Sequence, residues 1–583
     1  MSQIEIANPT PNTSEADLLK AKERGLLFML VMAVATGIVA GVGAWGFRML
    51  IGLVHNVLFL GEFVFTYDAN VHTLASPWGA GIILVPVIGA VAVAWLVKNF
   101  APEAKGHGVP EVMDAIHYNQ GRIRPRVAVV KSLASAISIG SGGSVGREGP
   151  IVQIGSAFGS TLGTIISMRP QDRITLIAAG SGAGIAATFN APLGGLVFAI
   201  ELLLITINAR NLLIVATATV IASYISRILI GTHPSFYVPA LEVPDFYLAQ
   251  PWGLAAFFVL GGLMGLLSVA FIRGLYKMED IFDALPGNYY TRHILGMFCV
   301  GVMMYLLLRN AGHYYVEGVG YAAIMDILVG VLNDPWFLLL LLALKLLATC
   351  LSLGSGASGG VFSPALFMGA TGGAAFGLFC HWVSPDLNIN IATFAIAGMA
   401  AMIGGTTGAV LTGIIMLTEM TQDESVVLPM IIAGSVAYAV RKSIMTESIY
   451  TMKLVARGHT VPEGLESAVM TTYRVSDVME TGFSVTDMDS EMPTDRGAVI
   501  QSEADQIKRV TVRAIADGSV RPVSHTVARV DTMLLEALTE MLAVEAQIIL
   551  VSRHPDSGDP KDITGVVSPA AIARFLKSKA DLL

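Results

Sequence analysis

A single carboxylate, Glu148, stands inside a cluster of glycine and serine residues that interrupts a long apolar sequence, GSGGSVGREGP at 140–150. Glycine permits unusual backbone dihedral angles, and proline is favoured in the first turn of a helix. The cluster therefore predicts open backbone followed by a helix whose unpaired N–H groups face the break. Such groups attract anions. Glu148 either complements this helix dipole or occupies the anion's own site, which it would leave when protonated or displaced.

The same arrangement occurs a second time in the chain. Residues 131–155 read KSLASAISIGSGGSVGREGPIVQIG, and residues 345–369 read KLLATCLSLGSGASGGVFSPALFMG, so that the two align without a gap. Glu148 corresponds to Phe362 in the second copy. Each copy predicts a helix, a break and a new helix. The matched Lys131 and Lys345 are expected to be buried structural cations, paired with carboxylates or carbonyls.

A second pair of segments repeats at nearly the same offset: APLGGLVFAIE at 191–201 and AVLTGIIMLTE at 409–419. Each ends on a carboxylate, Glu201 or Glu419, for which we expect a structural role in capping or pairing at a helix end. We therefore predict two related halves within residues 25–455. The repeat itself does not decide whether the halves are inverted.

The composition indicates a membrane protein. The 583 residues are 54% hydrophobic and only 14% charged, with a mean hydropathy of +0.66, far from the average of soluble proteins. Some apolar runs are long enough to span a bilayer, namely 78–97, 211–231, 252–275 and 292–309; others are too short, namely 151–166, 185–204 and 392–404. Broken helices in corresponding halves indicate a substrate site near the bilayer midplane, and here an anion pathway.

The N-terminal segment, residues 1–24, is polar, and the apolar run after it is too long for a signal peptide. Because Lys20, Lys22 and Arg24 precede that run, the positive-inside rule predicts a cytoplasmic N-terminus. The three cysteines lie in or beside apolar stretches, as buried hydrophobic side chains do. No metal cluster, phosphate loop or nucleophile–base arrangement stands out, so we expect neither an enzyme nor a metal site.

Beyond residue 473 charged residues become frequent, and short β-like runs at 510–515, 547–552 and 563–568 alternate with helical patterns at 533–543 and 569–578. This predicts a cytoplasmic α+β module, residues 473–583, after a linker at 456–472. Residues 534–576 resemble the helix–strand–strand–helix unit of a CBS motif, and VSDVM at 475–479 resembles the start of another. Binding of an adenine nucleotide there is a hypothesis, and no other cofactor is expected.

Three motifs, GHGVPE (106–111), GREGP (146–150) and GVFSP (360–364), occur in this order, and Tyr450 stands at the start of a last helix. Together they resemble the anion-binding signatures of the CLC family of chloride channels and proton/chloride antiporters. The resemblance implies an all-α polytopic membrane protein of two inverted repeats with broken and tilted helices. It also implies a homodimer with one pore in each subunit, surrounded by lipid in the cell (inner) membrane, with both termini cytoplasmic and no nucleic-acid partner.

The resemblance assigns the role of gate to Glu148. It implies that an anion, chloride or another small ion, is bound by the loop His107–Gly108, the hydroxyl of Tyr450, the aromatic edge of Phe362 and the backbone amides of Gly146, Arg147, Glu148, Gly149, Val361 and Phe362. Backbone amides suit a transported anion because they offer dipoles without a full charge that would trap it.

Two positions depart from the family pattern. His107 stands where the family usually has serine, or proline in some nitrate-preferring members. Its imidazole could donate to the anion or turn away, which leaves the preferred anion open and makes pH-dependent conduction a hypothesis. The second position is Leu202. Many proton-coupled members have a glutamate there, next to the glutamate that corresponds to Glu201. Leucine cannot carry a proton.

Two functions of different classes therefore remain. We predict a passive, gated anion channel, which Leu202 favours. The alternative is a proton-coupled chloride antiporter, which the retained Glu148 and Tyr450 favour. A fluoride exporter of the same family is not expected, because its usual signatures differ from GHGVP and GREGP. The leading two differ in whether an ionisable side chain lies between Glu148 and the cytoplasm.

Overall fold

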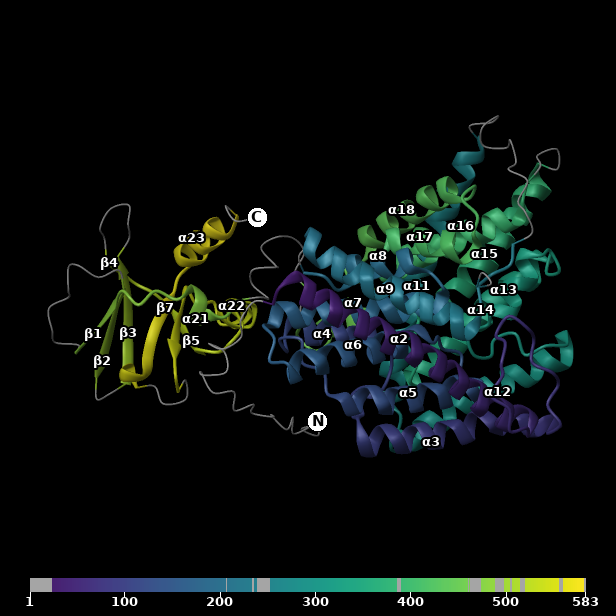
Figure 1. The fold of residues 1–583 in the computed structure, drawn as a ribbon, viewed down its shortest axis with the longest axis horizontal. Coiled ribbons are helices and arrows are strands. Elements are labelled where there is room, and N and C mark those ends of the chain that lie inside the picture. Colours follow the sequence, from purple (N-terminus) through teal and green to yellow (C-terminus); the bar gives the residue numbers. More distant parts are fainter. Residues whose placement is uncertain are drawn as a thin grey trace. The chain divides into compact units, whose positions relative to one another are not determined.

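The computed structural model describes residues 24–205, 207–232, 235–238, 252–384, 389–459, 461, 473–487, 498–503, 506–513, 520–554 and 559–580. The chain divides into two compact units, residues 1–460 and 461–583. The first is built of helices, and the strands of the described residues belong to the second (Figure 1). The division falls inside the predicted linker, 456–472.

The first half of the helical unit runs from α2 to α9. Its elements are α2 (Leu26–His55), the π-helical η1 (Asn56–Leu60), η2 (Gly79–Leu84), α3 (Val85–Phe100), η3 (Pro102–Ala104), α4 (Val109–His117), α5 (Pro125–Gly140), α6 (Glu148–Ile165), α7 (Pro170–Phe189), α8 (Pro192–Leu202) and α9 (Ala209–Ile230). The second half comprises α11 (Trp252–Ala284), α12 (Tyr289–Ala311), α13 (Tyr321–Leu328), α14 (Pro335–Ser355), α15 (Phe362–Val383), α16 (Ile391–Thr407), α17 (Val410–Thr421), α18 (Val427–Ile444) and α19 (Thr451–Val455).

Eight helical segments among the described residues are long and apolar enough to cross a membrane, and each of the four predicted spans lies within one of them apart from at most one residue at one end. In contrast, α8, α16 and α17 are apolar but only 11, 17 and 12 residues long. The predicted run 185–204 is broken, because α7 ends at Asn190 in the left-handed conformation (φ 56°). The chain is an integral membrane protein that mixes full spans with short, broken helices, as predicted.

The two predicted breaks are confirmed as interruptions between helices. The first separates α5 from α6, and the second separates α14 from α15. The two open segments meet, because Gly146 and Gly360 exchange backbone hydrogen bonds of 2.8 and 2.7 Å. A Cβ atom on either glycine would collide with the carboxylate of Glu148. Glycine is therefore required on both sides of this contact.

The two halves are inverted, as the resemblance implied. Glu201, near the end of α8, accepts a hydrogen bond of 2.7 Å from the N–H of Thr412 at the start of α17. Glu419, near the end of α17, accepts one of 2.7 Å from the N–H of Gly194 at the start of α8. Since each helix lies with its end against the other's beginning, the two matching helices run in opposite directions. The predicted capping role of both carboxylates is confirmed.

The second unit holds two sheets, of order β1-β2-β3-β4 and β5-β6-β7. Its elements are α21 (Val475–Val478), β1 (Phe483–Asp487), β2 (Ala498–Glu503), β3 (Gln506–Arg513), β4 (Val520–Pro522), β5 (His525–Arg529), α22 (Leu534–Ala543), β6 (Ile548–Ser552), η5 (Pro560–Asp562), β7 (Ile563–Val567) and α23 (Pro569–Ala580). The predicted helix–strand–strand–helix unit is confirmed as α22–β6–β7–α23, an order that is consistent with a CBS-like unit. Residues 514 and 515 of the first predicted strand lie outside the described residues.

Candidate functional site

The carboxylate of Glu148 lies against the N-terminus of α15. Its Oε1 accepts hydrogen bonds from the backbone N–H groups of Phe362 (2.5 Å) and Ser363 (3.2 Å), and its Oε2 accepts one from the Ser363 hydroxyl (2.9 Å). The side chain is buried, with 2% of its surface exposed. A negative group thus occupies unpaired amides at a helix N-terminus, which is where an anion would be stabilised.

Other predicted residues surround this carboxylate. Gly146 pairs with the second break, Val361 is the N-cap residue of α15, and Gly149 lies in the first turn of α6. A Cβ atom on Gly149 would stand 3.2 Å from the amide nitrogen of Gly108, so the break also touches the loop before α4. The side chain of Arg147 turns elsewhere, with its guanidinium over the rings of Phe189 and Tyr321 at 5.7 and 5.1 Å.

His107 and Tyr450 form a second cluster with Tyr276, a residue of α11. Both predicted residues are buried, and their ring centroids are 6.1 Å apart. The hydroxyl of Tyr276 donates to the carbonyl oxygen of Ile449 (2.7 Å) and lies 3.3 Å from Nε2 of His107. Because the tyrosine proton is already donated, the hydrogen-bond pattern assigns a proton to Nε2 of the imidazole. Nδ1 is then a buried acceptor with no partner among the described residues.

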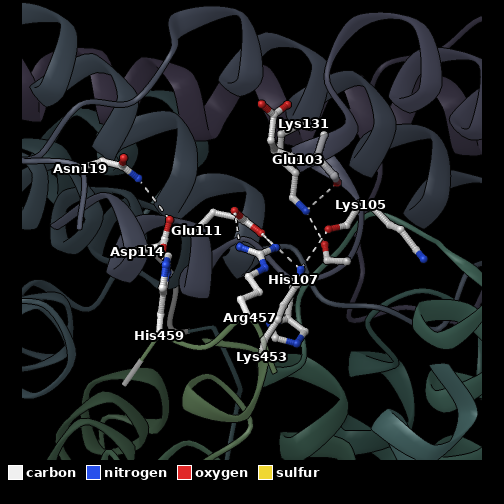
Figure 2. A network of polar contacts seen from close by, with 12 residues as sticks. Glu103, Lys105, His107, Glu111, Asp114, Asn119, Lys131, Lys453, Arg457 and His459 are labelled. Atoms are coloured by element: carbon white, nitrogen blue, oxygen red, sulfur yellow. Dashed lines mark hydrogen bonds and ion pairs between the residues drawn. The ribbon is translucent and has the colours of Figure 1, made fainter. Parts of the chain in front are cut away.

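A network of charges lies next to His107, between α4 and the end of α19 (Figure 2). The guanidinium of Arg457 binds both oxygens of Glu111, at 2.6 and 3.1 Å, and the ammonium of Lys453 lies 3.3 Å from the same carboxylate. One turn along α4, Asp114 pairs with His459 at 2.5 Å. These contacts fasten the segment after Tyr450 to the helix that follows the GHGVP loop.

The two repeated lysines bind carbonyl oxygens, as predicted for buried structural cations. Lys131 donates to the carbonyls of Ala104 (3.0 Å) and Gly106. Lys345 donates to matching carbonyls in the loop before α13, at Val316 (3.0 Å) and Gly318 (2.9 Å). Each lysine therefore holds the loop that precedes a short helix, and the loop held by Lys131 carries His107.

Leu202 is the last residue of α8. Its neighbour Glu201 uses both carboxylate oxygens to cap α17. The end of α8 therefore offers no uncommitted carboxylate at either position, in agreement with the departure from the family pattern noted in the sequence.

The sequence analysis missed three side chains of the site. Ser363 donates to Glu148, Tyr321 lies 2.8 Å from the Ser363 hydroxyl, and Tyr276 contacts His107. Ser363 could have been found, because it stands within GVFSP at the position where the first repeat has Gly149, which carries no side chain. Neither tyrosine has a motif signal, because each belongs to a helix distant in sequence from its partner.

Comparison with known proteins agrees with the motifs. A family model described as "Voltage gated chloride channel" matches residues 89–442. The H(+)/Cl(-) exchange transporter ClcA of Vibrio vulnificus (strain YJ016) is 33% identical over 418 residues, which cover 70% of this chain and 85% of that protein. ClcA of Vibrio cholerae serotype O1 (strain M66-2) is 32% identical over 444 residues, covering 74% of this chain and 90% of that protein.

Solved structures are similar over the same part of the chain. A slow cyanobacterial Cl-/H+ antiporter is 26% identical, with a TM-score of 0.65, and the match covers 75% of this chain and 99% of that one. A eukaryotic CLC transporter has a TM-score of 0.61 over 93% of this chain and 97% of its own, at 20% identity, which shows the fold alone. With a family model matching more than half of its residues, this chain belongs to the CLC family of chloride channels and proton/chloride antiporters.

Proposed function

We propose that this protein exchanges chloride for protons across the membrane, which was the alternative in the sequence analysis. The observation that carries the proposal is the position of Glu148, whose carboxylate occupies helix-terminal amides suited to an anion. A chloride ion and an ionised carboxylate cannot share these donors. Protonation removes the carboxylate's charge and frees the amides, so anion entry and proton uptake would occur at one group. The ClcA relatives, which are H(+)/Cl(-) exchange transporters, support the same mode.

His107 supports a proton route that does not use position 202. Its imidazole is an ionisable group beside Tyr450, and Nδ1 is an acceptor without a partner among the described residues. Intramembrane proton transfer requires such groups. In this proposal His107, in the loop before α4, supplies the ionisable group that is absent at position 202.

A passive anion channel is the second candidate, because Leu202 leaves α8 without a second carboxylate. The two modes predict different reversal potentials. We expect the reversal potential of the full-length protein in a planar bilayer, under a fixed chloride gradient, to shift when an opposing pH gradient is added. A potential that follows the chloride Nernst value and ignores pH would establish the channel instead.

The proposal extends to assembly and orientation. The family resemblance and the basic residues before α2 support a cytoplasmic N-terminus, with the CBS-like unit on the same side. The family resemblance supports a homodimer, and the exposed apolar side chains of α8, α9 and α17, among them Leu193, Tyr224 and Leu411 at 56%, 61% and 56% exposure, form the interface that we propose for it. The CBS-like unit is proposed to be regulatory, and an adenine nucleotide is its candidate ligand.

A further inference from the structure

We propose that Ser363 and Tyr321 form a hydroxyl pair that holds the ionised carboxylate of Glu148 in the anion site and sets the pH at which it is released. The inference rests on the proposed gating role of Glu148. In this role the two hydroxyls are positioning groups, since they act on the anion pathway only through the carboxylate.

The direction of the hydrogen bonds follows from the donors available. The Ser363 hydroxyl lies 2.9 Å from Oε2 of Glu148 and 2.8 Å from the hydroxyl of Tyr321. An ionised carboxylate only accepts, so Ser363 must give it its single proton. The serine oxygen then accepts from the Tyr321 hydroxyl. This gives a chain from Tyr321 through Ser363 to Glu148, in which each bond polarises the next.

Two helices hold these hydrogen-bonded hydroxyls in place before any anion arrives. Ser363 lies in the first turn of α15 and Tyr321 opens α13; both side chains are almost fully buried. The Tyr321 ring is held edge-on by Phe236, at 5.2 Å between centroids, and faces the guanidinium of Arg147 at 5.1 Å. Because both hydroxyl oxygens are already placed, only their O–H bonds have to rotate when the carboxylate ionises, and no heavy atom has to move.

The pair favours the ionised gate over the protonated one. Hydrogen bonds to an ionised acceptor are roughly twice as strong as those between neutral groups. After protonation, rotation of the two O–H bonds lets Glu148 donate to Ser363, so the neutral gate is accommodated but held less firmly. Among the described residues, Tyr321 and Tyr450 interact electrostatically with Glu148, and the guanidinium of the adjacent Arg147 lies over the Tyr321 ring. The Ser363 variants below leave all three in place.

The test is chloride flux from liposomes containing the full-length protein, measured over a series of pH values. We expect Ser363→Ala to move the midpoint of acid activation to higher pH by about one unit, because a hydrogen bond to a charged group is lost. Tyr321→Phe should move it in the same direction by less. Ser363→Thr keeps the hydroxyl and should retain the wild-type midpoint. Combining Tyr321→Phe with Ser363→Ala should add nothing to Ser363→Ala alone.

Two comparisons make the outcome decisive. Thr371→Val is the control. It removes a buried hydroxyl from the same helix, α15, and this hydroxyl donates to carbonyl oxygens of α15 itself. The variant should leave the midpoint unchanged. Glu148→Gln separates the two proposals. If Glu148→Gln abolishes pH dependence while Ser363→Ala leaves the midpoint in place, the hydroxyl pair is refuted and the gate stands. If Glu148→Gln itself leaves pH dependence intact, the proposed function fails.

Discussion

Glu148 carries the chemistry of the proposed exchange, because its charge decides whether the amides of α15 are free. Glu148→Gln has nearly the same shape but cannot ionise or exchange a proton. We therefore expect chloride flux that no longer depends on pH, together with loss of chloride-driven proton movement. Parallel chloride and proton measurements on proteoliposomes test this. Retention of proton movement would show that protons bypass this residue.

His107 is the side chain proposed to pass protons to the gate. His107→Ser replaces it with the residue usual in the family and removes the vacant Nδ1 acceptor. We expect chloride flux to persist while the number of protons moved per chloride falls several-fold. His117→Ser is the matched control, because His117 is also buried in this region, on α4, and its Nδ1 also lacks a partner among the described residues. An unchanged ratio in His107→Ser would exclude the relay.

Site residues that belong to a motif were predictable from the sequence. Site residues that are recognised only by their tertiary contacts were not. The motifs GREGP and GVFSP identified Glu148 and Phe362, which the structure brings together across the two breaks. Tyr321 and Tyr276 could not be found, since each reaches its partner from a helix that is remote in sequence. The tautomer assigned to His107 likewise depends on the Tyr276 hydroxyl, and so was not available from the sequence.

At the scale of elements, the breaks were predictable from residue types, whereas the inversion of the halves was predictable only from the family resemblance. Glycine clusters and first-turn prolines indicate where helices end and begin. Their relative direction emerges from contacts such as the reciprocal caps made by Glu201 and Glu419. A carboxylate at the end of a helix indicates some cap or ion pair, but its partner here is 211 or 225 residues away in sequence and is selected by packing.

The contact between α4 and α19 should survive the acidic pH at which the gate opens. Glu111 lies outside the eight spanning segments. Burial alone would raise its pKa, but the charges of Lys453 and Arg457 outweigh burial and lower the pKa below its ordinary value of 4.5. A carboxyl group with a lowered pKa contributes stability that is present above its unfolded value and is lost as the pH falls through the folded value.

Glu111→Gln tests this contact through its pH dependence. We expect the variant to have a lower melting temperature than the wild type at pH 7, and the difference to persist at pH 5. Below pH 4.5 the difference should shrink, because the wild-type carboxyl group also becomes protonated. Thermal unfolding in detergent across pH 4 to 7 provides the measurement, with Glu447→Gln as a partly exposed control whose sequence neighbour Thr446 is its hydrogen-bond partner among the described residues. A difference independent of pH would contradict an ionic contact.

At the scale of the whole molecule, the two units have separate cores and so should be separable in function. The second unit buries its own cluster, which includes Leu534, Ile549 and Val567. We expect a chain truncated after residue 472 to retain chloride flux in liposomes, because it keeps Tyr450 and the contacts of α19. Truncation after Ile449 removes both and should abolish flux. If the chain truncated after residue 472 is folded and inserted but has lost flux, the CBS-like unit is needed for transport itself.

The dimer proposal concerns a surface that packing within one chain leaves uncovered. Exposed apolar side chains occur both on α8, α9 and α17 and on α3, where Trp95 is 51% exposed, so exposure alone does not separate a subunit interface from a lipid-facing surface. A two-fold interface uses the same surface of both subunits, so residues close to the axis lie near their own copies. In a variant without the three native cysteines, at least one of Leu193→Cys, Tyr224→Cys and Leu411→Cys should therefore cross-link in the membrane, whereas Trp95→Cys should not. Cross-linking through Trp95→Cys alone would place the interface at α3 and contradict an interface formed by α8, α9 and α17.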